Sequence, residues 1–248
     1  GFGAGCIGRS SRGDFNLWHL DGGEHWYGSI PDCQFALWEQ QGDQVRVHAL
    51  ATEPMRDDSR PESGKPLSRW QWYPASTEET STGTYAARYP LSWNHYDGVF
   101  RADVSCEAFS PILPGDYQRS SYPVALFRWT LSNPTNKPLE LSLLLSWRNT
   151  VGWFTNTDSS AEVHFRDDGS PEHNYAPAIG EGEGQSNCWI DADGISGVLL
   201  DGKRSTPVAE GEGQWCLALQ DTWEGVELMR SSRWDPSSDG AELWQPFA

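Results

Sequence analysis

The sequence is poor in basic residues. It contains 18 Lys and Arg residues against 35 Asp and Glu residues, which gives its 248 residues a formal net charge of −17. Nucleic acids and anionic membranes bind through clustered Lys and Arg side chains, and no basic stripe interrupts the acidic background. The composition therefore argues against nucleic acid as a partner and favours a neutral or cationic one. A neutral sugar fits it better than a phosphate.

Long hydrophobic runs and paired cysteines are also missing. The most apolar stretch, Leu139–Trp147, contains three polar residues and is far too short to span a membrane as a helix. The five cysteines are Cys6, Cys33, Cys106, Cys188 and Cys216. An odd, scattered set favours reduced thiols over a disulfide framework, so we expect a cytoplasmic location. The chain begins at Gly1 rather than Met, which leaves open whether a targeting segment precedes it.

Motifs for the common site chemistries are absent. None of the six histidines has the H-E-x-x-H spacing, G-x-S-x-G does not occur, and no spacing singles out a pair among the carboxylates. Asp191–Gly194 begins like a calcium loop but continues with Ile195 and Ser196, so a turn before a strand is the better interpretation. We therefore expect no metal and no cofactor, and the motifs assign no catalytic residue.

Two familiar patterns open the chain. Gly3–Gly8 matches G-x-G-x-x-G, and Arg12-Gly13-Asp14 matches the cell-adhesion tripeptide. A dinucleotide site needs a strand leading into the glycines and a helix leaving them, and the residues after Gly8 lack a helical period. Three residues recur by chance in many proteins. We interpret both patterns as incidental.

Strand periodicity, in contrast, is abundant. Apolar residues occupy every second position in Cys33–Leu37, Val45–Ala49 and Phe100–Ala108, and the residues between the first two are typical of a hairpin turn. The clearest unit joins two strands, 125–131 and 139–147, through a turn that contains two prolines. Trp129 and Trp147 fall on the apolar faces of these strands. Further strands are predicted at Ala161–Phe165, Cys188–Ile190, Gly197–Leu200, Cys216–Gln220 and Val226–Arg230.

No segment of ten or more residues keeps a helical period, so the predicted fold class is all-β. We expect a large antiparallel β-sandwich of two packed sheets, forming a single domain over residues 1–248. Long loops are predicted at Glu53–Arg69 and Asp167–Asn187. Several tryptophans lie outside the strand alternation and suit either a sugar ring or a neighbouring domain: Trp18, Trp26, Trp70, Trp72, Trp93 and Trp153.

Three blocks of sequence resemble the N-terminal domain of glycoside hydrolase family 116, the family of the bile-acid β-glucosidase or non-lysosomal glucosylceramidase. The first block is GFGAGCIGRSSRGDFNLWHL, at the start of the chain. The second is CQFALWEQQGDQVRVHAL, and the third runs from YPLSWNHYDGVF through SPILPGDYQRSSYPV to FRWTLSNPTNKPLELSLLLSWRN. The blocks occur in the expected order. The match becomes loose from about Asn156 onward.

This resemblance implies a two-domain parent enzyme, in which an N-terminal β-sandwich packs on a C-terminal (α/α)6 barrel that follows Ala248. In such enzymes a Glu nucleophile and an Asp acid/base on the barrel hydrolyse β-glucosides, including glucosylceramide, with retention. Neither carboxylate maps onto this sequence. The resemblance therefore implies a non-catalytic half of a glycosidase, inactive alone, whose partner is the helical domain and which reaches the substrate through that domain.

We further expect the sandwich to cover an apolar face of the barrel and to supply loops to the rim of its substrate pocket. The Gly-rich opening allows close backbone approach, and Trp18 and His19 lie outside the strand alternation. The candidates for the rim or the domain interface are Arg9, Asp14, Trp18, His19, Asp116 and Tyr117. Two alternatives stay open: a free-standing carbohydrate-binding module and a self-contained hydrolase.

Overall fold

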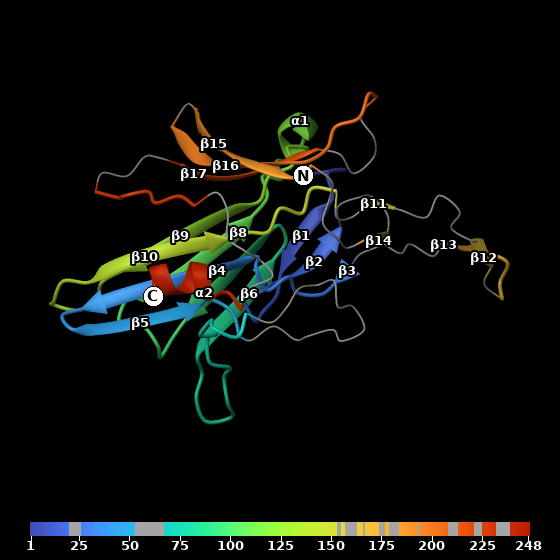
Figure 1. The fold of residues 1–248 in the computed structure, drawn as a ribbon. Coiled ribbons are helices and arrows are strands. Elements are labelled where there is room, and N and C mark those ends of the chain that lie inside the picture. Colours follow the sequence, from blue (N-terminus) through green and yellow to red (C-terminus); the bar gives the residue numbers. More distant parts are fainter. Residues whose placement is uncertain are drawn as a thin grey trace. The chain divides into compact units, whose positions relative to one another are not determined.

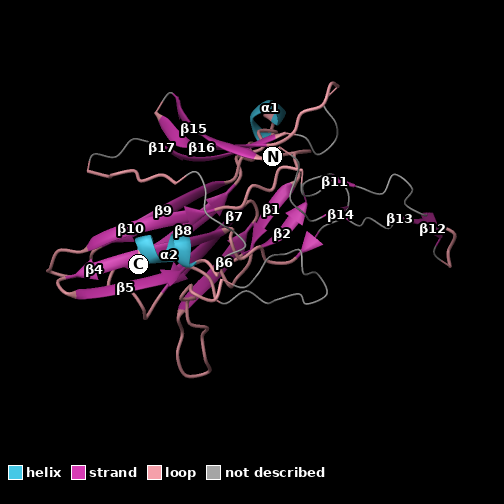
Figure 2. Ribbon diagram, viewed as in Figure 1, coloured by secondary structure: helices cyan, strands magenta, loops and turns pink. Residues whose placement is uncertain are grey.

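The structure is a computed structural model that describes residues 1–19, 26–52, 67–152, 155–156, 163–165, 167–173, 177–178, 184–192, 194–207, 213–220, 225–231 and 239–248. In these ranges the chain consists mostly of antiparallel strands, with two short helices (Figures 1 and 2). It divides into two compact units. Unit 1 comprises Gly1–Trp147 and Asp235–Ala248, and unit 2 comprises Arg148–Trp234. The single domain over residues 1–248 stays a prediction.

Unit 1 contains three sheets and both helices. Its strands are β1 (Cys6–Arg9), β2 (Phe15–His19), β3 (Trp26–Tyr27), β4 (Gln34–Gln41), β5 (Gln44–Ala49), β6 (Gly83–Arg88), β7 (Leu91–Tyr96), β8 (Asp103–Phe109), β9 (Leu126–Ser132) and β10 (Glu140–Ser146). The helices are α1 (Tyr117–Ser120) and α2 (Ala241–Phe247). The strand orders are β1-β2-β3, β10-β4-β5 and β6-β7-β8-β9.

Aromatic side chains join the two larger sheets of unit 1. The Phe35 ring on β4 lies 5.3 Å from the Phe127 ring and 4.9 Å from the Trp129 ring, both on β9. Edge-to-face contacts at these distances are favourable in addition to the apolar area that they bury. Because β4 and β9 belong to different sheets, the two sheets pack face to face. This confirms the predicted all-β sandwich.

The strand alternation read from the sequence holds along β9. Phe127, Trp129 and Leu131 are half-buried, whereas the residues between them are exposed. The predicted hairpin before Val45 is also confirmed, since β4 and β5 pair up to Gln41 and Gln44.

The predicted strand Phe100–Ala108 begins later than expected, at Asp103. The buried carboxylate of Glu39 on β4 explains the shift, because it accepts the backbone N–H groups of Arg101 and Ala102, each at 2.8 Å. These two donors therefore bond to a side chain instead of a neighbouring strand.

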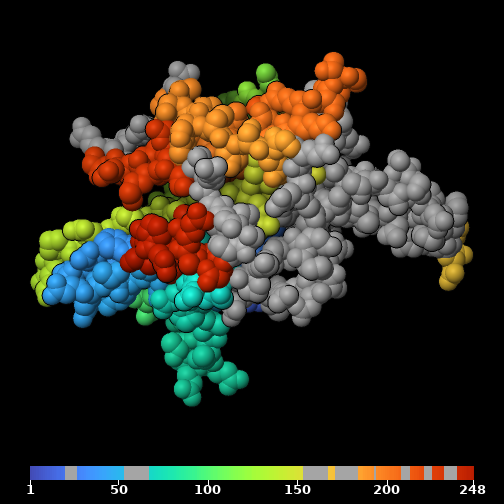
Figure 3. All heavy atoms as spheres, viewed as in Figure 1, coloured from blue at the N-terminus to red at the C-terminus, as the bar shows by residue number. Residues whose placement is uncertain are grey.

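α2 belongs to the outer layer of unit 1. Its Trp244 ring stacks on Trp70 at 5.1 Å, and the backbone N–H of Ala49 at the end of β5 donates to the Gln71 carbonyl. Figure 3 shows the red surface of α2 next to the blue surface of β4 and β5. No helical period marks α2 in the sequence, because the helix has only seven residues and contains Pro246.

In its described residues, unit 2 contains one three-stranded sheet and two short two-stranded sheets. Its strands are β11 (Thr155–Asn156), β12 (Val163–Phe165), β13 (Pro171–His173), β14 (Pro177–Ala178), β15 (Ser186–Ala192), β16 (Ile195–Asp201) and β17 (Gln214–Gln220). The pairs are β11-β14 and β12-β13, and the larger sheet has the order β15-β16-β17. The strands predicted at Cys188–Ile190, Gly197–Leu200 and Cys216–Gln220 are confirmed.

The strand predicted at Val226–Arg230 is wrong. The segment has no strand partner in the described part of the chain, and the Arg230 guanidinium bonds to the side chain of Asp191 instead. Other predicted features fall largely on residues that are not described. Glu53–Pro66 in the first predicted loop, residues 179–183 in the second, and residues 161–162 at the start of a predicted strand lie outside the described ranges.

Candidate functional site

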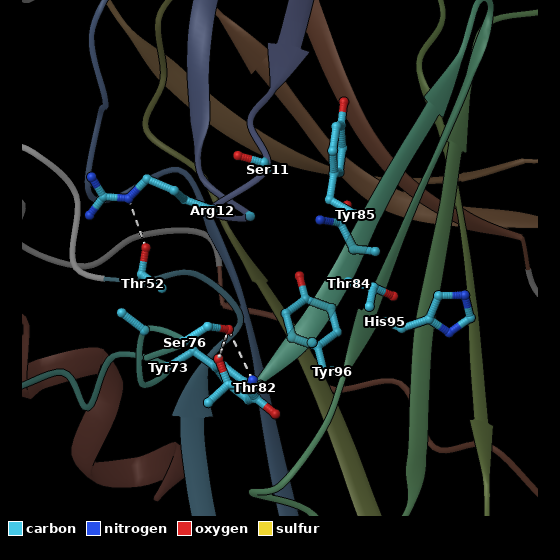
Figure 4. Close-up of a pocket in the computed structure, with 14 residues that line it drawn as sticks. Ser11, Arg12, Thr52, Tyr73, Ser76, Thr82, Thr84, Tyr85, His95 and Tyr96 are labelled. Atoms are coloured by element: carbon cyan, nitrogen blue, oxygen red, sulfur yellow. Dashed lines mark hydrogen bonds between the residues drawn. The ribbon is translucent and has the colours of Figure 1, made fainter. Parts of the chain in front are cut away.

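A pocket of about 360 Å³ opens at one edge of unit 1, between the β1–β2 turn and the β6–β7 hairpin (Figure 4). Its lining is dominated by hydroxyl groups: those of Ser11, Thr52, Tyr73, Ser76, Thr82, Thr84, Tyr85 and Tyr96. Its other ionisable side chains are Arg12 and His95. The volume lies at the small end of the range for ligand sites, and most of the accessible lining surface is apolar.

The β1–β2 turn is held against the segment that follows β5. The Arg12 Nε donates to Thr52 Oγ1 at 2.8 Å, and the Thr52 N–H donates back to the Arg12 carbonyl at 3.0 Å (Figure 4). Gly13 has a φ of +89°, and a β-carbon there would clash with the Leu50 carbonyl oxygen. Only glycine combines this backbone conformation with so close an approach. The adhesion-like tripeptide is thus a turn fixed to its own sheet.

Arg9, one of the predicted site residues, lies behind this pocket wall. Its guanidinium donates to the Gly13 carbonyl at 2.8 Å and to the Tyr96 hydroxyl at 2.7 Å. The same group lies 5.2 Å from the Phe35 ring centre and 5.4 Å from that of Trp129. Such placement over aromatic faces stabilises a partly buried cation. Arg9 therefore joins the turn to both sheets of the sandwich.

Tyr96 continues this network toward the pocket. Its hydroxyl donates to the Leu50 carbonyl at 2.8 Å, and burial raises its pKa above the usual value. The neighbouring Tyr73 donates to the Asp97 carbonyl at 2.8 Å, and burial raises its pKa as well. Both phenols are therefore neutral at physiological pH. Because each hydroxyl proton is already donated to a backbone carbonyl, neither phenol offers a ligand a charge or a free proton.

The other candidates from the opening block make their contacts within unit 1. The Asp14 carboxylate is buried and accepts hydrogen bonds from the hydroxyls of Ser10 and Ser29. Trp18 is buried, with its indole N–H donating to the Gly28 carbonyl at 2.9 Å and its ring 5.7 Å from that of Trp147. His19 is half-buried.

Asp116 and Tyr117 lie at a different place, the start of α1. Asp116 accepts the Arg119 backbone N–H at 2.9 Å as the N-cap of this helix. That bond and the Arg119 guanidinium lower the Asp116 pKa. Tyr117 is 77% exposed. The structure therefore divides the six candidates into four residues of the β1–β2 region and two at α1, and the role of all six at a rim or interface stays a prediction.

The hydroxyl-bearing residues that line the pocket come from several separate segments, and no motif connects them. Two of them, Ser11 in the opening block and Tyr96 in the block YPLSWNHYDG, belong to stretches that carry the resemblance. The convergence becomes visible only once β6 and β7 pair beside the β1–β2 turn.

Among the described residues, none that lines the pocket is an Asp or Glu. Nor do three or more His, Cys, Asp or Glu side chains gather in a metal-binding arrangement anywhere in the described ranges.

Comparison with protein families decides what kind of domain this is. The family model described as β-glucosidase 2, glycosyl hydrolase family 116, N-terminal, matches residues 1–248, the full length of the sequence. The chain belongs to this family. The resemblance seen in the opening block and in the block around SPILPGDYQRSSYPV is thereby confirmed, and the match also covers the region beyond Asn156. This family 116 N-terminal domain has, in its described residues, no helix long and apolar enough to cross a membrane.

Proposed function

We propose that this family 116 domain is the non-catalytic N-terminal half of a retaining β-glucosidase and packs on a C-terminal helical domain that carries the catalytic carboxylates. The observation that carries the proposal is the family match over the whole chain. The substrate class is a β-glucoside, with glucosylceramide as the proposed lipid substrate and the cytoplasm as the proposed location.

A complementation assay tests this proposal. The 248-residue chain, the separately produced helical domain and their mixture are each incubated with an aryl β-glucoside. We expect no turnover by the chain alone and a large gain when the chain is added to the helical domain, because the sandwich completes the folded enzyme. Turnover by the chain alone would overturn the proposal, as would a helical domain whose activity and stability do not change on mixing.

We also propose that Tyr117 lies at the domain interface or at the rim of the substrate pocket. Its side chain is 77% exposed, so replacing it costs unit 1 little packing. Tyr117→Ala in the full-length enzyme should raise KM or weaken the domain contact while the melting temperature of the isolated chain stays unchanged. Tyr89→Ala is the matched control, because Tyr89 is 79% exposed on the same unit and is not a candidate. Equal effects of the two substitutions would contradict the assignment.

Asp14 and Trp18 require a different readout, because both side chains are buried and bonded within unit 1. Asp14→Ala and Trp18→Ala in the full-length enzyme should change stability together with KM. Unchanged melting and unchanged kinetics in both variants would exclude the two residues from the proposed role.

A second candidate function is carbohydrate binding by the sandwich itself. The observation that favours it is the pocket lined by neutral hydroxyl groups, beside the partly exposed ring of Tyr85. Calorimetric titration of the 248-residue chain with glucose and with an alkyl β-glucoside tests this function. Binding that is abolished by Tyr85→Ala would support it, and the absence of heat at millimolar sugar would exclude it.

A further inference from the structure

β6 is an edge strand, because the sheet order β6-β7-β8-β9 gives it a neighbour on one side only. The Asp97 N–H donates to the Thr82 carbonyl at 2.9 Å, in register with the β6–β7 ladder. Hydrogen-bonded and non-hydrogen-bonded pairs alternate along an antiparallel ladder, so Thr84 and Ala86 also bond to β7. The residues between them direct their backbone N–H and C=O groups away from β7: Gly83, Tyr85 and Ala87.

Two of these three residues have outward backbone groups that bond to nothing in the described part of the chain. Gly83 is satisfied locally, since its N–H donates to the Ser81 hydroxyl and its carbonyl accepts from that hydroxyl. Within the described residues, Tyr85 and Ala87 have no hydrogen bond on this side. Their N–H donors and C=O acceptors are therefore the groups with which an added strand pairs.

β6 also lacks the usual protection of a sheet edge. Proline, bulges and covering segments shield most natural edges, whereas β6 (GTYAAR) contains no proline and pairs with β7 over all six residues without a register shift. Five of its six residues are exposed. β5, an edge strand of the facing sheet, differs, because Ala49 at its end forms a bridge with Trp72. β6 is therefore the more open of these two edges.

The pocket of the candidate site lies beside β6 and distinguishes it from the other edge strands. Among the described strands, β6 and β7 line this pocket, and only β6 is at an edge. Tyr85 lines it from β6, together with Ser11 and Arg12 of the β1–β2 turn (Figure 4). Alternate side chains of an added strand point to the side of the sheet on which Tyr85 lies. Because most of the accessible lining is apolar, an apolar side chain of the added strand fits there.

Charge along β6 favours an acidic residue in the added strand. The β6–β7 hairpin, residues 83–96, contains Arg88 and His95 but no Asp or Glu, although the chain has 35 acidic residues. Arg88 ends β6, is exposed and has no ion pair within the described residues. The row of Arg88 across the sheet carries no acidic residue either: it continues with Leu91, Phe109 and Leu126. A carboxylate on the added strand can therefore pair with Arg88.

The carboxylates of the neighbouring segments lie away from Arg88. Asp97 is level with the residue before β6, at the opposite end of the strand. Glu78 and Glu79 lie in the loop before β6, at the tip of a turn. Glu107 is on β8, two strands away, and is paired with Arg128. None of these carboxylates competes with a partner for Arg88.

We infer that β6 binds an extended segment of a separate protein by strand addition. The segment pairs with the backbone of Tyr85 and Ala87, places an apolar side chain in the pocket and presents a carboxylate to Arg88. A second copy of this chain fits less well, because its own β6 has no acidic residue to offer. The inference goes beyond the proposed function, since it assigns the domain a further partner and a binding edge for it.

Fluorescence anisotropy with synthetic peptides tests the inference on the 248-residue chain and on the full-length enzyme. The probe is the labelled peptide Thr-Val-Thr-Val-Glu-Val-Thr, which alternates apolar and polar residues, and the control peptide has Lys in place of Glu. Both proteins should bind the Glu peptide about threefold to tenfold more tightly, because opposite charges on neighbouring strands attract. No binding at millimolar protein, or equal binding of the two peptides, would overturn the inference. Binding by the chain but not by the full-length enzyme would also overturn it.

Backbone methylation of the peptide tests whether the contact is a strand pairing. Two further peptides carry N-methyl groups on the odd or on the even residues. In an added strand only every second N–H faces β6, so one of the two peptides should lose at least about tenfold in affinity while the other keeps it. Equal affinities of the two methylated peptides would contradict strand addition.

Substitution of Arg88 locates the site on β6. Arg88→Glu should reverse the preference, so that the Lys peptide binds more tightly than the Glu peptide. Lys137→Glu is the matched control, because Lys137 is also exposed and lies in the turn between β9 and β10; it should leave the preference unchanged. Both variants should melt like the parent. An unchanged preference in Arg88→Glu would overturn the inference, as would a dimer of the peptide-free chain that the peptide dissociates.

Discussion

Unit 1 and unit 2 are both built from antiparallel strands, but they differ in how completely they bury their apolar side chains. In unit 1 the Phe15 ring contacts the rings of Phe35, Phe127 and Trp147, which come from three other strands or their ends. In unit 2 the large sheet leaves side chains such as Ile195 and Leu219 nearly half exposed. Two sheets that pack face to face bury each other's apolar side chains, whereas a single three-stranded sheet needs another layer to bury its own.

The two arginines that lie over aromatic rings show the same difference. Arg9 in unit 1 lies near three rings and has four hydrogen bonds to partners on three separate segments. Among the described residues, Arg230 in unit 2 lies over the Trp189 ring, and its ion-pair partner Asp191 is largely exposed. A cation contact in a desolvated site stabilises more than one that water screens. Two matched pairs of substitutions test this difference between the units, and a third pair and a pH dependence test single sites.

The largest effect is expected for Phe35→Ala. The change removes the ring that joins β4 to β9 and leaves a cavity, so the free energy of unfolding should fall by about 3–5 kcal/mol. The matched change in unit 2 is Leu219→Ala, which should cost less than about 1 kcal/mol because the side chain is already 47% exposed. Urea unfolding of the 248-residue chain measures both. Equal losses would show that unit 2 has a core as tight as that of unit 1.

Arg9→Lys comes next. Lysine keeps the charge but cannot reproduce the forked set of bonds to Gly13, Tyr96 and Leu50. We expect a loss of about 2 kcal/mol, the range for hydrogen bonds to a charged group. Arg230→Lys is the control and should change stability by less than about 1 kcal/mol, as exposed ion pairs do. A larger loss of stability for Arg230→Lys than for Arg9→Lys would contradict the expected difference between the units.

Asn149→Ala should act on unit 2 alone. The Asn149 side chain bonds to the Asp201 carbonyl and accepts the Val151 N–H at 3.0 Å. Its loss leaves buried groups without partners and should cost about 1–3 kcal/mol. Backbone amide exchange should therefore accelerate in β15 and β16 and stay unchanged in β4 and β9. Asn187→Ala, at an exposed position of the same network, should have the smaller effect. Faster exchange throughout both units would mean that they unfold together.

The smallest effect concerns pH and His48. Burial lowers the His48 pKa below 6.5, and the ring lies 6.0 Å from Tyr73 and 5.9 Å from Phe100. Because the unfolded chain binds the proton more tightly, the stability contributed by neutral His48 is present above about pH 6.5 and is lost as pH falls through the lower folded pKa. Unfolding free energies between about pH 7.5 and 5.5 should decline less in His48→Gln than in the parent. Identical slopes would contradict the assignment.

The parts of the fold that the sequence predicted are those in which the signal is local. β9 and the β4–β5 hairpin alternate within a few residues, and the alternation follows directly from burial of one face. β6 was missed because most of its side chains are exposed, so no apolar period marks it. The late start of β8 could not be predicted either, since it depends on a carboxylate 62 residues away in the sequence.

The candidate site was harder to predict for the same reason. The role of Arg9 at a rim or interface stays a prediction, and its partners Leu50, Asn94 and Tyr96 lie 41, 85 and 87 positions along the chain. No spacing rule connects them. Many of the residues that line the pocket carry hydroxyl groups, which are common in loops. Only the pairing of β6 with β7 brings them together. Membership of the family was recognisable from the sequence, because it depends on long matching blocks rather than on a single contact.

Amide hydrogen exchange in the 248-residue chain tests the central claim most directly. The account predicts slow exchange in β4 and β9, whose aromatic side chains pack against each other, and faster exchange in the β15–β17 sheet, where Ile195 and Leu219 are nearly half exposed. Equal protection of the two units would contradict it.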